Sequence, residues 1–87
     1  GPEQLNQYST KKYESAVKGY DGYIKHFEGL ANMSNADPEV KKQALASIDY
    51  YKKAKENAKI ELSEDLELSI SNPDEAKSKR RDSKPRF

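Results

Sequence analysis

Apolar residues recur every three or four positions along two long stretches of the chain. The first stretch contains Tyr13, Val17, Tyr20, Ile24, Phe27 and Ala31. The second contains Val40, Ala44, Ile48, Tyr51, Ala58 and Leu62, with one gap in the pattern at Lys55. A mean step of about 3.5 residues places side chains on one face of an α-helix, whereas a half-buried strand would alternate. The pattern therefore predicts two amphipathic helices, over residues 5–31 and 38–62.

The segment between these stretches has no apolar period and ends on a helix-start signal. Residues 32–36 are rich in turn formers, and Asp37-Pro38-Glu39 follows them. An Asp side chain can accept a first-turn amide, and Pro loses nothing at the first helical position. Glu39 suits the positive end of the helix dipole. Two helices of similar length joined by a short loop predict an antiparallel helical hairpin over residues 3–62.

The remaining residues divide by charge. Residues 63–75 are acidic and are expected to extend the second helix or to fold back as a short third helix, which would complete a small three-helix bundle. Residues 76–87 carry six bases and are expected to form a disordered basic tail. Asn72-Pro73-Asp74-Glu75 is expected to stop the helical run before it, and in an alternative it also caps a weak helical turn over residues 76–81. Gly1-Pro2 is typical of the remnant left after a purification tag is cleaved, and it is set apart. The expected fold class is all-α.

Composition excludes several classes of protein. The chain has no Cys, so disulfide scaffolds, thiolate metal sites and thiol catalysis are excluded. No run of 18 apolar residues exists that could span a bilayer, so no membrane insertion is expected. Neither a secretory signal nor a cysteine framework is present, which favours an intracellular location, cytoplasmic or nuclear.

The chemistry of the side chains gives no sign of catalysis. His26 is the only histidine, and a metal site would need three or four ligands. The chain has neither a Gly-rich phosphate loop nor a nucleophile-bearing turn. The sequence thus predicts no enzyme, no cofactor, no metal site and no small-molecule substrate.

Two apolar stripes are more than a lone hairpin can enclose. We therefore expect an apolar edge, rimmed by Tyr and Lys, that binds a partner helix or a second copy of the chain. Ser15, Gly19 and Gly22 form a small-residue strip, which would admit either a partner's helix or the second helix of the hairpin. Off-stripe tyrosines suit core edges and interfaces alike. The candidate partner-binding residues are Tyr8, Ser15, Gly19, Gly22, Tyr23, Tyr50, Leu66 and Ile70.

The basic tail offers a second interpretation. Its bases are Lys77, Lys79, Arg80, Arg81, Lys84 and Arg86. Such a run resembles a nuclear import signal or a patch for nucleic acid or acidic protein. The alternative function is therefore a nuclear or nucleic-acid-associated module. Nucleic acid is the less favoured partner, because the lysines on the helices are dispersed and Arg, the usual reader of base edges, is confined to the tail.

Three segments carry a family resemblance. Tyr13-Glu14-Ser15-Ala16 followed by Tyr20, the segment 38–42, and the segment 51–56 together resemble the microtubule-interacting and transport (MIT) domain. Tetratricopeptide helices share much of this pattern. The resemblance implies a noncatalytic adaptor whose groove between two helices takes an amphipathic peptide from an assembly-machinery partner. MIT domains have a full helix before this pair, whereas about ten residues precede it here.

Overall fold

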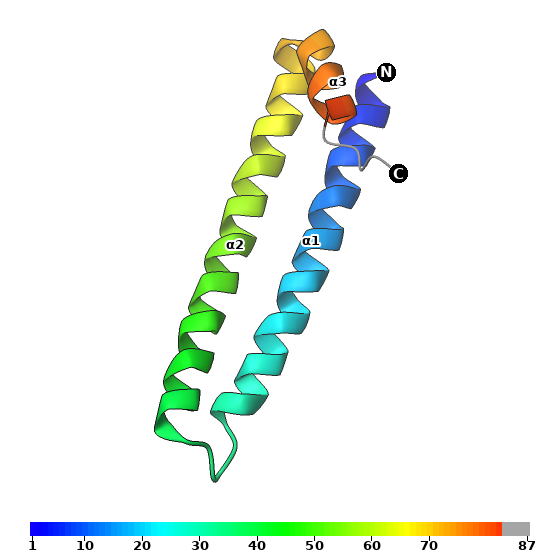
Figure 1. Cartoon of the computed structure of the whole chain (residues 1–87). Coiled ribbons are helices and arrows are strands. Elements are labelled where there is room, and N and C mark those ends of the chain that lie inside the picture. The colour runs from blue at the N-terminus through cyan, green and yellow to red at the C-terminus, as the bar shows by residue number, and fades with distance from the viewer. Residues whose placement is uncertain (83–87) are drawn as a thin grey trace.

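The computed structural model describes residues 1–82, apart from the side chains of Pro2, Arg81 and Asp82. Over this range the chain forms α1 (Pro2–Ala31), α2 (Pro38–Ser71) and α3 (Pro73–Asp82), with no strand among them. Helices α1 and α2 lie side by side and antiparallel, and α3 folds back at the end where the chain begins (Figure 1). The prediction of an all-α fold built on an antiparallel helical hairpin is confirmed.

The core lies along the seam between α1 and α2, where the two predicted stripes face each other. Ile24 and Ala31 of α1 are buried there, as are Ala44 and Ile48 of α2. At the end near α3, the Ser69 hydroxyl is buried and lies 2.7 Å from Asn6 Oδ1 and 2.8 Å from the Leu66 carbonyl oxygen. The contact with Asn6 links α2 to α1, whereas the contact with the Leu66 carbonyl lies within α2.

The acidic segment lengthens α2. The apolar period continues through Leu62, Leu66 and the buried Ser69, so the helix follows it to Ser71, beyond the predicted end at residue 62. Pro73 then stops the helix, because the residue before a proline is driven out of the helical region. Asn72 accordingly leaves the helical region, with φ −150° and ψ 81°. Of the two structures expected for residues 63–75, the extension covers 63–71 and a third helix begins only at Pro73.

The expected boundary of the basic tail at residue 76 is wrong for residues 76–82, which belong to α3. Asn72 starts this helix, since its Oδ1 accepts a hydrogen bond from the Glu75 amide at 3.2 Å. Its Nδ2 donates in return to Glu75 Oε2 at 3.1 Å. This reciprocal capping, together with the burial of Ala76, holds a polar segment in a helix. Lys84 and Arg86 lie outside the described residues.

The molecule is long and incompletely covered. Its radius of gyration is 17.2 Å, against about 12 Å expected for a compact chain of this length. Its accessible surface is 6848 Å², against about 5,200 Å² for a typical monomer of the same mass. Because α3 has only ten residues, it spans about 15 Å of a molecule 54 Å long. A three-helix bundle therefore exists at one end only.

The start of α2 provides a direct test of local stability. The Asp37 carboxylate accepts a hydrogen bond from the Glu39 amide at 2.8 Å. We expect Asp37→Ala to lower the free energy of unfolding by about 1 kcal/mol, or roughly 4–8 °C in Tm for a domain of this size. Asp37→Asn keeps the acceptor and should cost far less. Equal losses in the two variants, measured by thermal unfolding, would show that the hydrogen bond has no role.

Candidate functional site

One side of the seam is hollowed between the middle parts of α1 and α2. Ala16 of α1 and Ala54 and Ala58 of α2 form a low floor, because their methyl groups fill little of the space between the helices. The hollow, called the central groove here, has a volume of about 300 Å³. It is lined by Ser9, Lys12, Tyr13, Ala16, Tyr20, Ala54, Asn57, Ala58, Glu61, Leu62 and Asp65.

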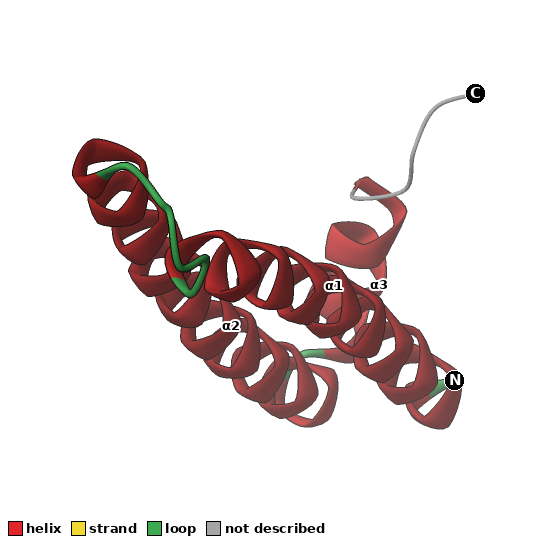
Figure 2. Ribbon diagram, turned by 90° about the horizontal axis from the view of Figure 1, so that it is seen from below, coloured by secondary structure: helices red, strands yellow, loops and turns green. Residues whose placement is uncertain are grey.

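Helix α3 lies on one side of the plane that contains α1 and α2 (Figure 2). Its cavity against the hairpin and the central groove share four lining residues, which are Ser9, Lys12, Glu61 and Asp65. The central groove therefore begins where α3 ends, on the same side of the hairpin. From there it continues toward the loop between α1 and α2.

Five aromatic rings continue the groove toward that loop. Tyr51 is their centre: the Tyr23 ring stacks on it with centroids 4.9 Å apart, and the Tyr50 ring meets it edge-on at 5.1 Å. Tyr20 and Phe27 complete this aromatic cluster at 6.0 and 6.1 Å from Tyr51. Tyr51 is half-buried in the seam, whereas Tyr23 and Tyr50 are 53% and 66% exposed. The cluster thus presents large ring surfaces to solvent.

Charge is confined to the borders of this surface. The floor alanines, Asn57 and the aromatic cluster are all uncharged, in a chain of which 36% of residues are charged. Lys12 Nζ lies 3.7 Å from Glu61 Oε1 at the end near α3. Lys55 and Asp21 pair at 2.6 Å across the seam, and the hydrogen bond from Lys55 to Asp21 raises the pKa of the lysine. The charged residues that line the hollow, Lys12, Glu61 and Asp65, all lie at the end near α3, so the rest of it fits an apolar ligand surface.

The structure brings together only some of the predicted partner-binding residues. Tyr23 and Tyr50 meet in the aromatic cluster. Ser15, Gly19 and Gly22 are exposed, and a Cβ added at either glycine would meet nothing within 4 Å. The alternative in which these glycines let the second helix approach is therefore wrong, because nothing packs against them.

The other predicted residues lie at the end of the hairpin near α3. Tyr8 is half-buried, with the Arg80 guanidinium 5.6 Å from its ring centroid. Leu66 is half-buried and Ile70 is 81% exposed. Their helical period places Leu66 and Ile70 on the flank of the seam opposite the central groove. Tyr8, Leu66, Ile70 and the glycine strip therefore do not form one surface with Tyr23 and Tyr50.

Two of the six bases expected in a disordered tail, Lys79 and Arg80, contact the hairpin instead. Lys79 Nζ lies 2.6 Å from Asp65 Oδ1, and this hydrogen bond raises the pKa of the lysine. Arg80 packs on Tyr8, a contact of the cation–π type. Lys77 is exposed. The side chain of Arg81, like Lys84 and Arg86, lies outside the described residues.

Tyr20 and Ala58 lie on the predicted stripes, but the stripes did not predict the groove that these residues line. The available signal was Ala58 itself, a small residue at a stripe position where a full core would place a larger side chain. Nothing in the sequence indicated the contact between Asp65 and Lys79, because it depends on how α3 folds back on α2.

Comparison with known proteins does not assign the chain to a family. Neither a protein-family model, nor a curated protein, nor a solved structure matches the chain. The resemblance to MIT and tetratricopeptide helices therefore stays a prediction. Within residues 1–82, no three His, Asp or Glu side chains gather as a metal site would require. Over the same range, every helix is too short or too polar to cross a bilayer.

Proposed function

We propose that the chain is a noncatalytic helical interaction module, an adaptor or scaffold fragment, that binds an amphipathic helix of a partner protein in the central groove. The observation that carries this proposal is the aromatic cluster, with Tyr23 and Tyr50 exposed, beside a hollow whose charged residues lie only at the end near α3. Tyr is over-represented among the residues that dominate binding energy at protein interfaces. Exposed apolar surface of this kind, bordered by charge, marks interaction sites on soluble proteins.

A helix is the ligand shape that fits. Beyond Ser9 and Lys12, which the groove shares with the cavity under α3, the groove and the aromatic cluster extend from Tyr13 to Phe27 along α1, a length of about 21 Å or four helical turns. A third helix laid on a helical hairpin packs between the two helices below. Helix α3 takes this position over its own short length, where it contacts both α1 and α2. The low alanine floor would let the axis of the bound helix come close, and Tyr23 and Tyr50 would flank it.

A second copy of the chain fits this side less well. In a two-fold dimer the same surface meets itself, so it must be self-complementary. A hollow that meets an identical hollow leaves a void between the copies, whereas a helix is convex and fills it. The chain should therefore have the mass of a monomer, 9.9 kDa, in light scattering at about 100 μM. A dimer that Tyr23→Ala and Tyr50→Ala disrupt would replace partner binding by self-association.

The proposal is tested by selecting helical peptides against the chain. A displayed library of 18-residue peptides would carry a randomised apolar face on a fixed helical frame. Selected peptides should bind the wild-type chain and lose at least tenfold in affinity with Tyr23→Ala or Tyr50→Ala. Ile60→Ala and Ile70→Ala are the matched controls, because these side chains are also exposed but lie elsewhere on α2. Selected peptides that bind all five chains alike would refute the site.

Salt separates this function from the alternative one. Contact between apolar helices should persist in about 0.5 M salt, whereas phosphate binding by basic residues should collapse there. The assay pairs the selected peptide with a 20-base-pair duplex as the comparison ligand. If only the duplex binds, and only at low salt, the nucleic-acid function replaces the one proposed.

A further inference from the structure

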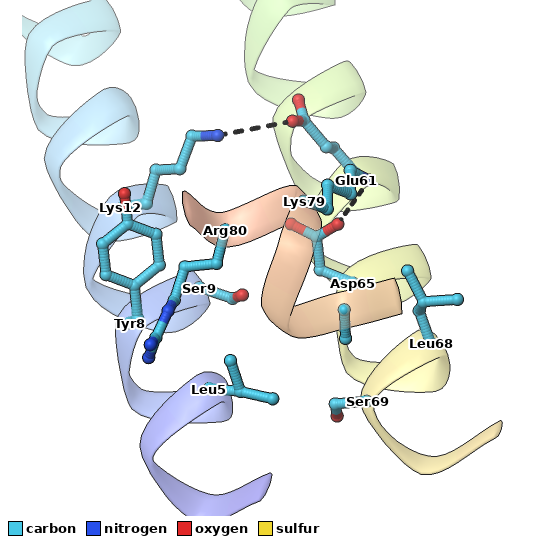
Figure 3. Close-up of a pocket in the computed structure, with 11 residues that line it drawn as sticks. Leu5, Tyr8, Ser9, Lys12, Glu61, Asp65, Leu68, Ser69, Lys79 and Arg80 are labelled. Carbon is cyan, nitrogen blue, oxygen red and sulfur yellow. Dashed lines mark hydrogen bonds and ion pairs between the residues drawn. The ribbon is translucent and has the colours of Figure 1, made fainter. Parts of the chain in front are cut away.

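Helix α3 is held against the hairpin mainly by polar contacts. Ala76 is its one buried apolar residue among those described. Lys79 pairs with Asp65 on α2, and Arg80 lies over Tyr8 on α1 (Figure 3). These three residues follow the spacing i, i+3 and i+4, so they share one face of α3. The contact face of α3 is therefore one small apolar residue followed by two bases.

The fit beneath this face is incomplete. A cavity of about 120 Å³ lies between α3 and the hairpin, beside these contacts. Leu5 and Leu68 line it from α1 and α2 (Figure 3). Ala76 lines it from α3. About 10–15 Å³ suffices for one water molecule, so this cavity can accept much more than the methyl group that Ala76 offers. A longer apolar side chain at this position would gain contact with both leucines.

We propose that α3 occupies a binding site for a helix of a partner protein, and that this helix displaces α3. The partner helix would carry a large apolar residue over Leu5 and Leu68. At +3 and +4 from this residue it would carry Lys and Arg, which would meet Asp65 and Tyr8. This inference rests on the proposed function, because it extends the helix-binding groove to the end that α3 covers. The two hollows share lining residues, so a bound helix longer than four turns would meet α3 and have to displace it.

The connection to α2 permits this exchange. Asn72 alone joins the two helices, so rotation about its backbone would let α3 move away while α2 keeps its hydrogen bonds. Exchange of α3 with a second copy is less favourable. The α3 of a second copy carries the same Ala76, so it would leave the same cavity unfilled and gain no contact over the chain's own α3. The favoured occupant is therefore the helix of another protein.

The first arm of the test changes α3 within the full chain. Ala76→Leu fills the cavity, so hydrogen exchange of the amides of residues 77–80 should slow at least tenfold. Ser78→Leu adds the same side chain at an exposed position of α3 and should leave the exchange unchanged. The proposal would be overturned if Ala76→Leu accelerates hydrogen exchange of these amides, or if Ala76→Leu and Ser78→Leu slow it equally.

The second arm supplies the competing helix. The probe is a synthetic peptide of residues 73–82 carrying Ala76→Leu, added to the full chain whose own α3 is weakened by Lys79→Ala. The methyl NMR signals of Leu5 and Leu68 should shift on binding. The peptide concentration that gives the same shift should rise at least tenfold when the peptide also carries Lys79→Glu. It should rise as much when the host chain also carries Ala76→Leu.

The outcomes separate this inference from the proposed function. Shifts at Leu5 and Leu68 support displacement of α3, even if no library peptide binds the aromatic cluster. Shifts confined to Tyr23 and Tyr50 overturn displacement and leave the central groove in place. A doubled mass on addition of peptide would show exchange of α3 between copies, which also overturns the proposal.

Discussion

Ile48→Ala should lower the free energy of unfolding by about 2–5 kcal/mol, the range measured when a large aliphatic side chain is cut to Ala in a core. Ile48 of α2 and Ile24 of α1 are each only 8% exposed and belong to the seam that joins the helices. Small domains of this kind have a total stability of about 5–15 kcal/mol. Ile24→Ala should have a similar effect, and the double variant should be unfolded.

Chemical and thermal unfolding followed by circular dichroism measure this loss. Ile60→Ala removes the same atoms from a side chain that is 49% exposed, and it should cost less than about 1 kcal/mol. Melting close to wild type in both Ile24→Ala and Ile48→Ala would contradict the seam as the main source of stability.

Tyr51→Ala should cost about 2–4 kcal/mol, somewhat below the range for a fully buried aromatic side chain. Tyr51 contacts Tyr20, Tyr23, Phe27 and Tyr50, so its loss removes the ring around which the other four pack. The adjacent Tyr50 contacts Tyr51 and is largely exposed. Tyr50→Ala should therefore cost below about 1 kcal/mol.

The neighbouring pair separates folding from binding. Tyr51→Ala should lower Tm strongly, and Tyr50→Ala should leave Tm nearly unchanged while it weakens binding of a selected peptide. Equal losses of stability in the two variants would mean that Tyr50 is covered in solution, which contradicts the exposed cluster.

The sequence predicted the hairpin well because its signal is periodic. Ile24, Ala31, Ala44 and Ile48 all belong to the predicted stripes, and all are buried in the seam. A hydrophobic stripe is repeated over many turns, so a single irregular position such as Lys55 does not hide it. The cap at Asp37 is equally local, and the start of α2 matches it.

The position of α3 could not be predicted in this way. Its described part buries a single alanine, and its other contacts join residues that lie far apart in the chain, such as Arg80 with Tyr8. A basic segment with so little apolar content reads as a solvated tail. Only the arrangement of α1 and α2 brings Tyr8 and Asp65 to where α3 can meet them.

The candidate site was predicted in part for the same reason. Tyr23 and Tyr50 stood out because they leave the stripe centres, and the structure places them on one exposed cluster. The glycine strip had an equally regular spacing, but spacing does not say whether a face has a neighbour. Gly19 and Gly22 face open space, so close approach of a helix within this chain does not explain them.

The central claim is that the groove side of the seam beyond α3 is open to solvent in the chain alone. The most direct measurement is the relaxation of tyrosine ring protons by a soluble gadolinium chelate, which acts on groups according to their exposure. The rings of Tyr23 and Tyr50 should relax several times faster than that of Tyr51. Equal protection of all three rings would mean that another part of the chain or a second copy already covers the groove, and would contradict the proposed function.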